Sequence, residues 1–361
     1  MKILHIITSL RIGGAEKLMV DLLPKLRDLG NEVELLLFDG VRTEFMEQLE
    51  GVGVKIHTEK VGGSVYAPRN IFYIRHFINQ FDIVHTHNTA PQLFAPLAKI
   101  LAFGSDVKLI TTEHNTTNRR RDKCFFKILD RWMYSKYAKI ICISNQAEIN
   151  LRRYLDDWST NICTIFNGID LTKFSNNTNE KLQSNEGITV TMVAAFRKQK
   201  DQQTLIRAFS LLPVNFRLQL VGDGDIELIE RNKDLTRRYN LSTRVVFMGM
   251  RTDIPAILHS SDIIVLSSHY EGLSLSSLEG MMSGRPFVAS DVEGLHEIVD
   301  GYGLLFPHGD AQALADIILK LSEDKVFATL IAQKCQERAR QFDINVMAEK
   351  YMNVYREVLS N

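Results

Sequence analysis

Short apolar runs alternate with longer amphipathic patterns along the whole chain. The run KILHIIT is followed by AEKLMVDLLPKLRDLG, where Leu18, Leu22 and Leu26 recur at helical spacing, and then by EVELLLF. Runs of Ile and Val bounded by polar residues are typical of buried parallel strands. Apolar residues at helical spacing are typical of helices that cover a sheet. The alternation therefore predicts an α/β protein with parallel sheets covered by helices on both faces.

A polar segment interrupts this alternation. Residues 175–187 (SNNTNEKLQSNEG) lack apolar periodicity, which is typical of a linker. A second series of strand-like runs starts with ITVTMVAAF and ends with GLLFP. We predict two doubly wound, Rossmann-like domains. Their expected extents are an N-terminal domain over 1–174, a linker over 175–187, a C-terminal domain over 188–341 and a final helix over 342–361.

Composition narrows the class of protein. The 361 residues suffice for two domains, and 45% of them are hydrophobic. The formal net charge is zero, so nothing in the whole chain argues for a nucleic-acid partner. The four cysteines lack zinc-ligand spacing and fit free thiols in a reducing compartment. The first apolar run is too short for a signal peptide, and no run reaches the ~20 residues of a membrane span, so we expect a cytoplasmic protein.

One stretch is locally basic. Residues 69–153 hold 14 Lys and Arg against 6 Asp and Glu. Within it, Arg119, Arg120, Arg121 and Lys123 precede an aromatic run that includes Trp132. Such a segment suits an anionic surface such as a pyrophosphate or a membrane interface, here the inner face of the plasma membrane. It equally suits a helix with one solvated basic face and one buried apolar face. We expect peripheral membrane contact through 119–133, with this alternative open.

Polar and glycine residues follow many of the predicted strands, where open parallel sheets bind ligands. Gly13 and Gly14 follow the first strand and can offer backbone N–H groups to an anion at a helix start. They do not form GxGxxG, so a nicotinamide cofactor has little support. The other residues at strand ends are His87, His114, Asn115, Arg197, Lys200, Gly222 and Arg251.

Two cations and two carboxylates stand out in the second half. Arg197 and Lys200 lie at a helix start, where they oppose the helix dipole, and a diphosphate would explain them. Pro286 and Gly284 predict that a helix over 275–282 ends there. Glu271 then lies in the loop before this helix and Glu279 in its second turn. Carboxylates accept paired hydrogen bonds from vicinal hydroxyls, which a sugar or a ribose offers.

With these motifs the chain resembles retaining glycosyltransferase family 4, which has the two-domain GT-B fold. The most specific motif is E-x7-E at Glu271 and Glu279. The supporting motifs, in order, are GGAE (13–16), DIVHTH (82–87), TEH (112–114), NGID (167–170), QKD (199–201), VGDG (221–224) and GRPFVASDVEGLHEIV (284–299). The resemblance spans essentially the whole chain. It implies two domains that face each other across a cleft and a last helix that crosses back to the N-terminal domain.

The resemblance also implies a role for each site residue. Glu279 would bind the ribose of a nucleotide sugar, and Glu271 the donor sugar. The backbone amides of Gly272, Leu273, Ser274 and Leu275 would assist Glu271. Arg197 and Lys200 would bind the diphosphate, with Gly13 and Gly14 close to it, and Gly222 and Arg251 would border the donor. His114 would face the reacting sugar. Asn115 would lie on the acceptor side with His87, which is equally well explained as a buried structural histidine.

Two positions depart from the family's pattern. Many relatives carry Arg where Ala195 stands, so Arg197 would have to supply the guanidinium. Many relatives carry Gly where Ser274 stands, which affects the geometry of the sugar loop.

The expected function is transfer of a sugar, with retention of configuration, from a nucleotide-diphosphate sugar to a hydroxyl. A UDP-sugar is favoured over a GDP-sugar. The expected acceptor is a lipid-linked glycan in the assembly of a cell-surface polysaccharide such as lipopolysaccharide or capsule. We expect no metal and no cofactor, because side chains would neutralise the leaving diphosphate. The alternatives are a nucleotide-sugar epimerase of the same architecture and a non-catalytic protein that binds sugar nucleotides.

Overall fold

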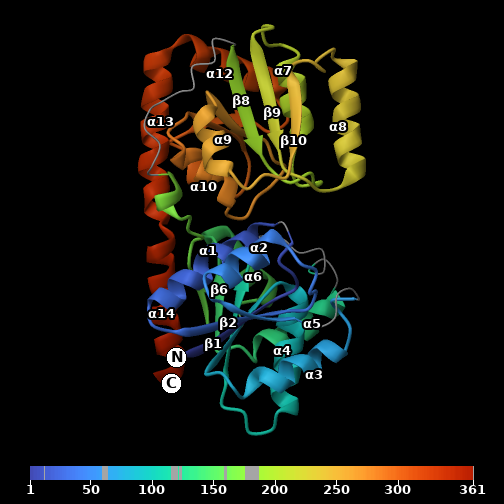
Figure 1. Cartoon of the computed structure of the whole chain (residues 1–361), viewed down its shortest axis with the longest axis vertical. Coiled ribbons are helices and arrows are strands. Elements are labelled where there is room, and N and C mark those ends of the chain that lie inside the picture. The colour runs from blue at the N-terminus through green and yellow to red at the C-terminus, as the bar shows by residue number, and fades with distance from the viewer. Residues whose placement is uncertain are drawn as a thin grey trace. The chain divides into compact units, whose positions relative to one another are not determined.

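The computed structural model describes residues 1–11, 13–58, 64–114, 121, 124–157, 161–174 and 187–360, with the side chains of 124 and 125 left out. The chain forms two compact units (Figure 1). The first contains Met1–Gly168 and Ile344–Asn361, and the second contains Ile169–Asp343. The predicted linker over 175–187 lies outside the described residues except for Gly187.

The first unit is built on a parallel sheet whose described strands number seven. The strands are β1 (Lys2–Ile7), β2 (Glu32–Leu37), β3 (Lys55–Thr58), β4 (Ile83–His87), β5 (Lys108–Glu113), β6 (Lys139–Cys142) and β7 (Ile162–Thr164). Their order is β3-β2-β1-β4-β5-β6-β7. The direction of winding therefore reverses between β1 and β4, and in open α/β sheets a ligand site lies at such a point.

Helices cover this sheet, and the described ones are α1 (Gly14–Asp28), α2 (Glu44–Gly51), α3 (Arg69–Ile78), α4 (Thr89–Leu101), α5 (Cys124–Tyr134), α6 (Asn145–Leu155) and α14 (Ile344–Ser360). Successive side chains of a strand point to opposite faces. Leu4 and Ile6 of β1 pack into a core with residues of α3 to α6. His5 lies on the other face. There α14 packs beside α1, which confirms the predicted return of the last helix (Figure 1).

The second unit repeats the architecture with six described strands in the order β10-β9-β8-β11-β12-β13. They are β8 (Ile188–Val193), β9 (Phe216–Val221), β10 (Val245–Gly249), β11 (Ile263–Leu266), β12 (Phe287–Asp291) and β13 (Leu304–Pro307). The described helices are α7 (Gln202–Phe209), α8 (Ile226–Arg238), α9 (Ile254–Ser260), α10 (Leu275–Met282), α11 (His296–Val299), α12 (Ala311–Glu323) and α13 (Lys325–Ala339). Two doubly wound domains are thus confirmed, and the winding of this sheet reverses between β8 and β11.

Local sequence explains the two helices that carry the site. Asp201 caps α7, because its carboxylate accepts hydrogen bonds from the backbone N–H of Thr204 (3.1 Å) and from the Thr204 hydroxyl (2.6 Å). The helix α10 ends at Met282, and Gly284 just beyond it takes φ +75°. That left-handed conformation favours glycine and stops a helix. The helix α10 therefore begins and ends where the sequence predicts.

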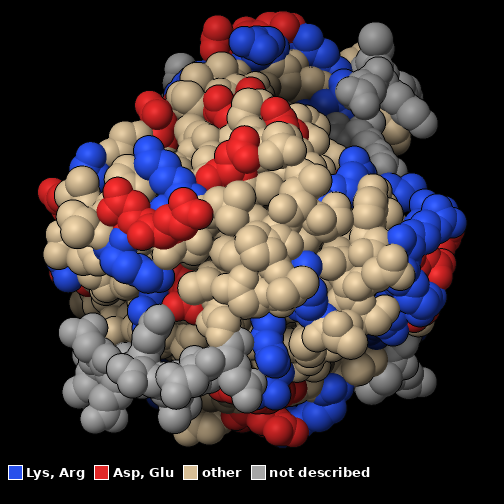
Figure 2. Space-filling model, turned by 90° about the horizontal axis from the view of Figure 1, so that it is seen from above, with Lys and Arg blue, Asp and Glu red and all other residues tan. Residues whose placement is uncertain are grey.

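The surface mixes charges of both signs. On the face seen in Figure 2, Lys and Arg lie beside Asp and Glu around a central area of other residues. This matches the zero net charge, since no field of one sign covers that face. Among the described residues, none of the helices combines the length and the apolar character that crossing a membrane requires.

Candidate functional site

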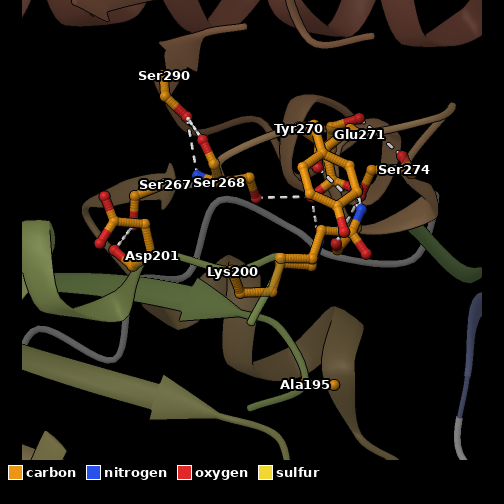
Figure 3. A network of polar contacts seen from close by, with 12 residues as sticks. Ala195, Lys200, Asp201, Ser267, Ser268, Tyr270, Glu271, Ser274 and Ser290 are labelled. Atoms are coloured by element: carbon orange, nitrogen blue, oxygen red, sulfur yellow. Dashed lines mark hydrogen bonds and ion pairs between the residues drawn. The ribbon is translucent and has the colours of Figure 1, made fainter. Parts of the chain in front are cut away.

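A polar network occupies the reversal point of the second sheet, where the chain leaves β8 and β11 (Figure 3). Its centre is Glu271, which is only 4% exposed. Lys200, on the segment between β8 and α7, reaches across to the Glu271 carboxylate and forms an ion pair with it. The two side chains are 11% and 5% exposed, so this charge pair is largely shielded from water.

Neighbouring groups hold the Glu271 carboxylate in place. The Ser268 hydroxyl donates to Oε1 (2.6 Å). Gln199 Nε2 donates both to Oε2 (3.0 Å) and to the Tyr270 carbonyl (2.9 Å). In addition to the ion pair with Lys200, each Glu271 carboxylate oxygen therefore accepts a hydrogen bond from a neighbouring side chain. Hydrogen bonds to a charged acceptor are strong and directional.

The loop that carries Glu271 rests on β12 and the segment after it. The Ser268 backbone N–H donates to Ser290 Oγ, and the Ser290 hydroxyl donates to the Ser268 carbonyl, both at 2.8 Å (Figure 3). Gly294 takes φ +83°, and a Cβ there would lie 2.3 Å from the Gly272 carbonyl oxygen and 2.4 Å from that of Glu271. A glycine is therefore required for the backbone of the 271–272 loop to approach this closely.

Glu279 lies on α10, eight residues after Glu271. It is 6% exposed, and its neighbours Leu278 and Met281 are fully buried. Ser274 precedes the helix, and its carbonyl accepts from the Ser277 hydroxyl (2.7 Å). Glu279 is thus a buried carboxylate on a helix of the second unit, unlike an ordinary surface glutamate. The amide segment Gly272–Leu275 runs from Glu271 into the start of the same helix.

The remaining predicted donor residues lie on neighbouring loops of the second unit. Arg197 is exposed on the segment after β8. Ala195, two residues before it, carries no donor (Figure 3). Gly222 follows β9, and its N–H donates to the Gly249 carbonyl (2.8 Å). Arg251 follows β10 and forms a two-bond pair with Asp253 (2.8 and 2.6 Å), which raises its pKa.

The first unit gathers its predicted residues at the reversal point between β1 and β4. Gly13 is the N-cap of α1, and Gly14 begins that helix. His87 ends β4 and is fully buried, while His114 directly follows β5 and is half-buried. His87 Nδ1 lies 2.9 Å from His114 Nε2. His87 is therefore a buried partner of His114, and Asn115 lies outside the described residues.

Sequence reasoning missed a larger polar cluster behind these two histidines. It consists of His5 on β1, His85 on β4, Thr112 on β5, and Tyr351 and Tyr355 on α14. Burial lowers the pKa of His5 to about 3 and that of His114 to about 4. It also lowers the pKa of His85 and of His87 well below the ordinary value. The alternation in DIVHTH, which puts His85 and His87 on one face, was the available signal.

The described part of the basic segment holds both paired and exposed side chains. Arg121 does not face an open surface: its Nη2 donates to Glu113 Oε2 (2.9 Å), and its side chain is 11% exposed. Lys127 and Arg131 both pair with Asp156. Trp132 packs against the core, whereas Ile128 is 75% exposed. The other basic residues of the segment, Arg119, Arg120 and Lys123, lie outside the described residues.

Two groups of described side chains have the spacing of metal ligands. One is His5, His85 and His87, and the other is Asp201, His269 and His308. In the first group, hydrogen bonds within the cluster already engage the ring nitrogens. In the second group, Asp201 caps α7, and His269 Nδ1 lies 2.7 Å from His308 Nε2.

Comparison with known proteins gives the family. Residues 12–173 match the model "Glycosyltransferase Family 4", and residues 187–324 match "Glycosyl transferases group 1". The chain belongs to glycosyltransferase family 4. The two matches fall on the two doubly wound sheets described above, in the same order.

Among relatives of this glycosyltransferase is an Escherichia coli UDP-Gal:alpha-D-GlcNAc-diphosphoundecaprenol alpha-1,3-galactosyltransferase. It is 28% identical over 78% of this chain and 77% of its own length. Another is a Campylobacter jejuni N,N'-diacetylbacillosaminyl-diphospho-undecaprenol alpha-1,3-N-acetylgalactosaminyltransferase, 26% identical over 93% of this chain and 94% of its own. The fold matches the crystal structure of Anabaena HepE in complex with UDP and glucose. The TM-score is 0.86 at 23% identity, over 98% of this chain and 99% of that one.

Proposed function

We propose that this glycosyltransferase moves a sugar from a UDP-sugar to a hydroxyl of a lipid-linked glycan. The observation that carries the proposal is a pair of buried carboxylates: Glu271, which is ion-paired with Lys200 at the reversal point of the second sheet, and Glu279 on the helix that follows. Carboxylates can accept paired hydrogen bonds from vicinal hydroxyls, which a sugar and a ribose both offer. The relative whose name specifies UDP-Gal supports the donor class, and the two relatives whose names specify a diphosphoundecaprenol-linked sugar support the acceptor class.

In this proposal the second unit binds the donor. Glu279 accepts from the ribose hydroxyls, and Glu271 with the amides of Gly272–Leu275 binds the sugar. Lys200 and Arg197 bind the diphosphate, in place of the guanidinium that Ala195 cannot provide. Since Lys200 already contacts Glu271, the bound donor would place diphosphate and sugar on the two sides of one existing ion pair.

The reaction follows with retention of configuration. The acceptor oxygen forms a bond to the anomeric carbon while the bond from that carbon to the diphosphate oxygen breaks on the same face. The leaving diphosphate oxygen takes the acceptor proton, so no covalent enzyme intermediate is needed. Lys200 and Arg197 stabilise the charge that develops on the diphosphate, which is how preorganised cations lower such a barrier.

The first unit would bind the acceptor, with His114 facing the reacting sugar. Because a lipid-linked acceptor lies in a membrane, the first unit would contact an anionic membrane peripherally through 119–133. Among the described side chains of that segment, the exposed Ile128 supports this contact. Sedimentation with vesicles of phosphatidylglycerol and phosphatidylcholine tests the contact. We expect Ile128→Asp to weaken sedimentation and Ile149→Asp, at an exposed position on α6, to leave it unchanged. Equal sedimentation of both variants would remove this part of the proposal.

Calorimetric titration tests donor binding. We expect UDP to bind more tightly than GDP, and Glu279→Gln to weaken UDP binding about tenfold or more, since hydrogen bonds to charged groups contribute about 1.5–3 kcal/mol. Glu230→Gln is the matched control, because Glu230 is an exposed glutamate on a helix of the same unit. Unchanged UDP affinity in Glu279→Gln would contradict the assigned site.

A turnover assay separates the proposed function from its rivals. UDP-sugars are incubated with and without a diphosphoundecaprenol-linked sugar, and the products are analysed by NMR. We expect UDP release to require the acceptor and the new linkage to keep the donor's anomeric configuration. Isomerised nucleotide without any acceptor would instead identify an epimerase, and binding without turnover would identify a non-catalytic protein. An inverted linkage would exclude the retaining mechanism.

A further inference from the structure

Seven buried or half-buried polar side chains of the first unit form one continuous chain of hydrogen bonds, which we call the histidine chain. In order its members are Tyr351, Thr112, His85, Tyr355, His5, His87 and His114. Its two phenols belong to α14, and its last member is the histidine placed at the reacting sugar. All but His114 are fully buried.

Within the part of the molecule that the structure describes, these contacts follow one another without a branch. Thr112 Oγ1 lies 3.1 Å from the Tyr351 hydroxyl and 2.8 Å from His85 Nε2. His85 Nδ1 lies 2.7 Å from the Tyr355 hydroxyl, which lies 3.5 Å from His5 Nε2. His5 Nδ1 lies 3.0 Å from His87 Nε2. The contact between His87 Nδ1 and His114 Nε2 closes the series.

The histidines of this chain are neutral at pH 7. Burial lowers the pKa of His5 to about 3 and of His114 to about 4, and the pKa values of His85 and His87 are lowered further by their histidine neighbours. A neutral imidazole carries one N–H and one acceptor nitrogen. Each contact between two members therefore holds one proton, and the order of donors along the chain can be counted.

The count is fixed at the α14 end. Tyr351 and Thr112 each carry one hydroxyl proton, and the two contacts that join Tyr351, Thr112 and His85 can hold only two protons. If His85 Nε2 also carried a proton, three protons would compete for two contacts, and one buried donor would lack an acceptor. Such a group costs about 1–3 kcal/mol. His85 Nε2 is therefore the acceptor, and the His85 proton is on Nδ1.

The same argument passes along the chain. The His85 Nδ1–H occupies its contact with Tyr355, so the Tyr355 hydroxyl must donate to His5 Nε2. The His5 proton is then on Nδ1 and occupies the contact with His87. By the same step the His87 Nδ1–H donates to His114 Nε2. The one remaining ring proton, that of His114, is on Nδ1.

We infer that Tyr351 and Tyr355 of α14 act as positioning residues, which fix all four histidines of the chain as Nδ1–H tautomers. His114 then presents Nδ1, the nitrogen that does not contact His87, as a hydrogen-bond donor. This step rests on the proposed function: the Nδ1–H of His114 would donate a hydrogen bond to an oxygen of the transferred sugar. It also leaves that nitrogen unable to act as a base, which agrees with proton transfer to the leaving diphosphate oxygen.

Nitrogen NMR tests the tautomers directly, on the full chain without donor or acceptor. The protein is labelled with 15N-histidine, and long-range proton–nitrogen correlations distinguish protonated from unprotonated ring nitrogens. His114→Gln identifies the His114 signals by their loss. We expect protonated Nδ1 and unprotonated Nε2 for His5, His85, His87 and His114. A protonated Nε2 in any of them would overturn the inference.

Two variants test the role of the phenols. Tyr355→Phe removes the hydroxyl that joins His85 to His5 and so interrupts the histidine chain. We expect His87 and His114 then to populate the Nε2–H form. Tyr137→Phe is the matched control, because Tyr137 is a buried phenol of the same unit whose hydroxyl donates to the Gln92 carbonyl (2.7 Å), away from the chain. We expect its tautomers to match those of the unaltered protein. Unchanged tautomers in Tyr355→Phe would refute the positioning role, and the spectrum of the unaltered protein decides the tautomers if that variant does not fold.

A metal ion among His5, His85 and His87 is the rival explanation of the cluster. Elemental analysis of the purified protein, with spectra before and after a chelator, examines it. We expect no stoichiometric metal and unchanged spectra, whereas a bound ion that shifts these histidine signals would overturn the inference.

The catalytic consequence is measured separately. We expect Tyr355→Phe to lower kcat about fivefold to tenfold with UDP affinity unchanged, because one weakened hydrogen bond is worth about 1 kcal/mol. A loss of UDP affinity as large as the loss of kcat would indicate that Tyr355 has a merely structural role. The tautomer measurement needs no turnover. Failure of the proposed function would therefore leave the tautomer result standing, and the wrong tautomer would leave the proposed function standing.

Discussion

At the scale of residues, the contact between Lys200 and Glu271 dominates the second unit. Removing one partner of a shielded ion pair leaves the other charge without its counterion, which costs more than losing both together. We predict that Lys200→Met lowers the free energy of unfolding by about 3 kcal/mol and that adding Glu271→Gln recovers part of the loss. Urea unfolding of the two single variants and the double variant measures this coupling.

The exposed pair of Asp234 and Arg237 on α8 provides the control cycle. Both of its side chains are more than half exposed, so water screens the pair and little coupling is expected. Effects of Lys200→Met and Glu271→Gln that add to within about 0.5 kcal/mol would contradict the prediction.

The sequence identified Lys200 and Glu271 as site residues but could not show that they bind each other. They are 71 residues apart, and their contact depends on the pairing of β8 with β11. The histidine chain is a similar case. His5 and His85 each interrupt an apolar run, and only the parallel register that pairs them, with α14 laid over that face, turns them into a cluster.

At the scale of elements, α10 packs very closely on the sheet. A Cβ at Gly280 would lie 2.8 Å from ring carbons of Phe287 on β12 and 3.0 Å from Cγ2 of Ile264 on β11. Gly280→Ala should therefore displace the helix. We predict a loss of about 1–3 kcal/mol in the free energy of unfolding, as for other overpacked cores, together with weaker UDP binding because Glu279 is the preceding residue.

Gly51→Ala is the control, since Gly51 lies in α2 with nothing within 4 Å of an added Cβ. There alanine should be neutral or stabilising by about 0.5–1 kcal/mol, because glycine is a poorer helix former. If Gly280→Ala behaves like Gly51→Ala in thermal melts and UDP titrations, close packing does not fix the position of α10.

Element boundaries were predictable where a local signal decides them. Gly284 with Pro286 predicts the end of α10. Asp201, the N-cap of α7, is a local signal of the same kind for the start of that helix. The extents of the units are harder to predict, because packing as well as composition decides which core a residue joins. Contacts divide the chain into units that meet between Gly168 and Ile169, and the predicted linker 175–187 lies outside the described residues except for Gly187.

At the scale of the whole molecule, the four histidines of the histidine chain should make the free energy of unfolding depend on pH. Their pKa values in the folded state are lowered, to about 3 for His5 and about 4 for His114, while an unfolded histidine titrates near 6.5. Below about pH 6.5 only the unfolded state takes up these protons. The stability is therefore present above pH 6.5 and is lost as the pH falls, by up to about 1.4 kcal/mol per pH unit for each histidine.

Urea unfolding between pH 7.5 and pH 5 measures this slope. His5→Gln should reduce the slope of unfolding free energy against pH by the contribution of one histidine, which is up to about 1.4 kcal/mol per pH unit. His76→Gln, which removes a histidine that is exposed on α3, should leave the slope nearly unchanged. A stability that is flat across this range would show that the cluster is not held neutral in the folded protein.

The membership of α14 in the first unit has a consequence for biosynthesis. A ribosome makes residues 1–168 first, then the whole second unit, and only then the helix Ile344–Ser360 that covers β1, β4 and β5. The second unit can thus fold during translation, as domains generally do. The first must wait until α14 has been made before Tyr351 and Tyr355 reach the histidines. A chain terminated before α14 would therefore carry a finished second unit and a first unit with an open polar core, a natural target for chaperones and proteases.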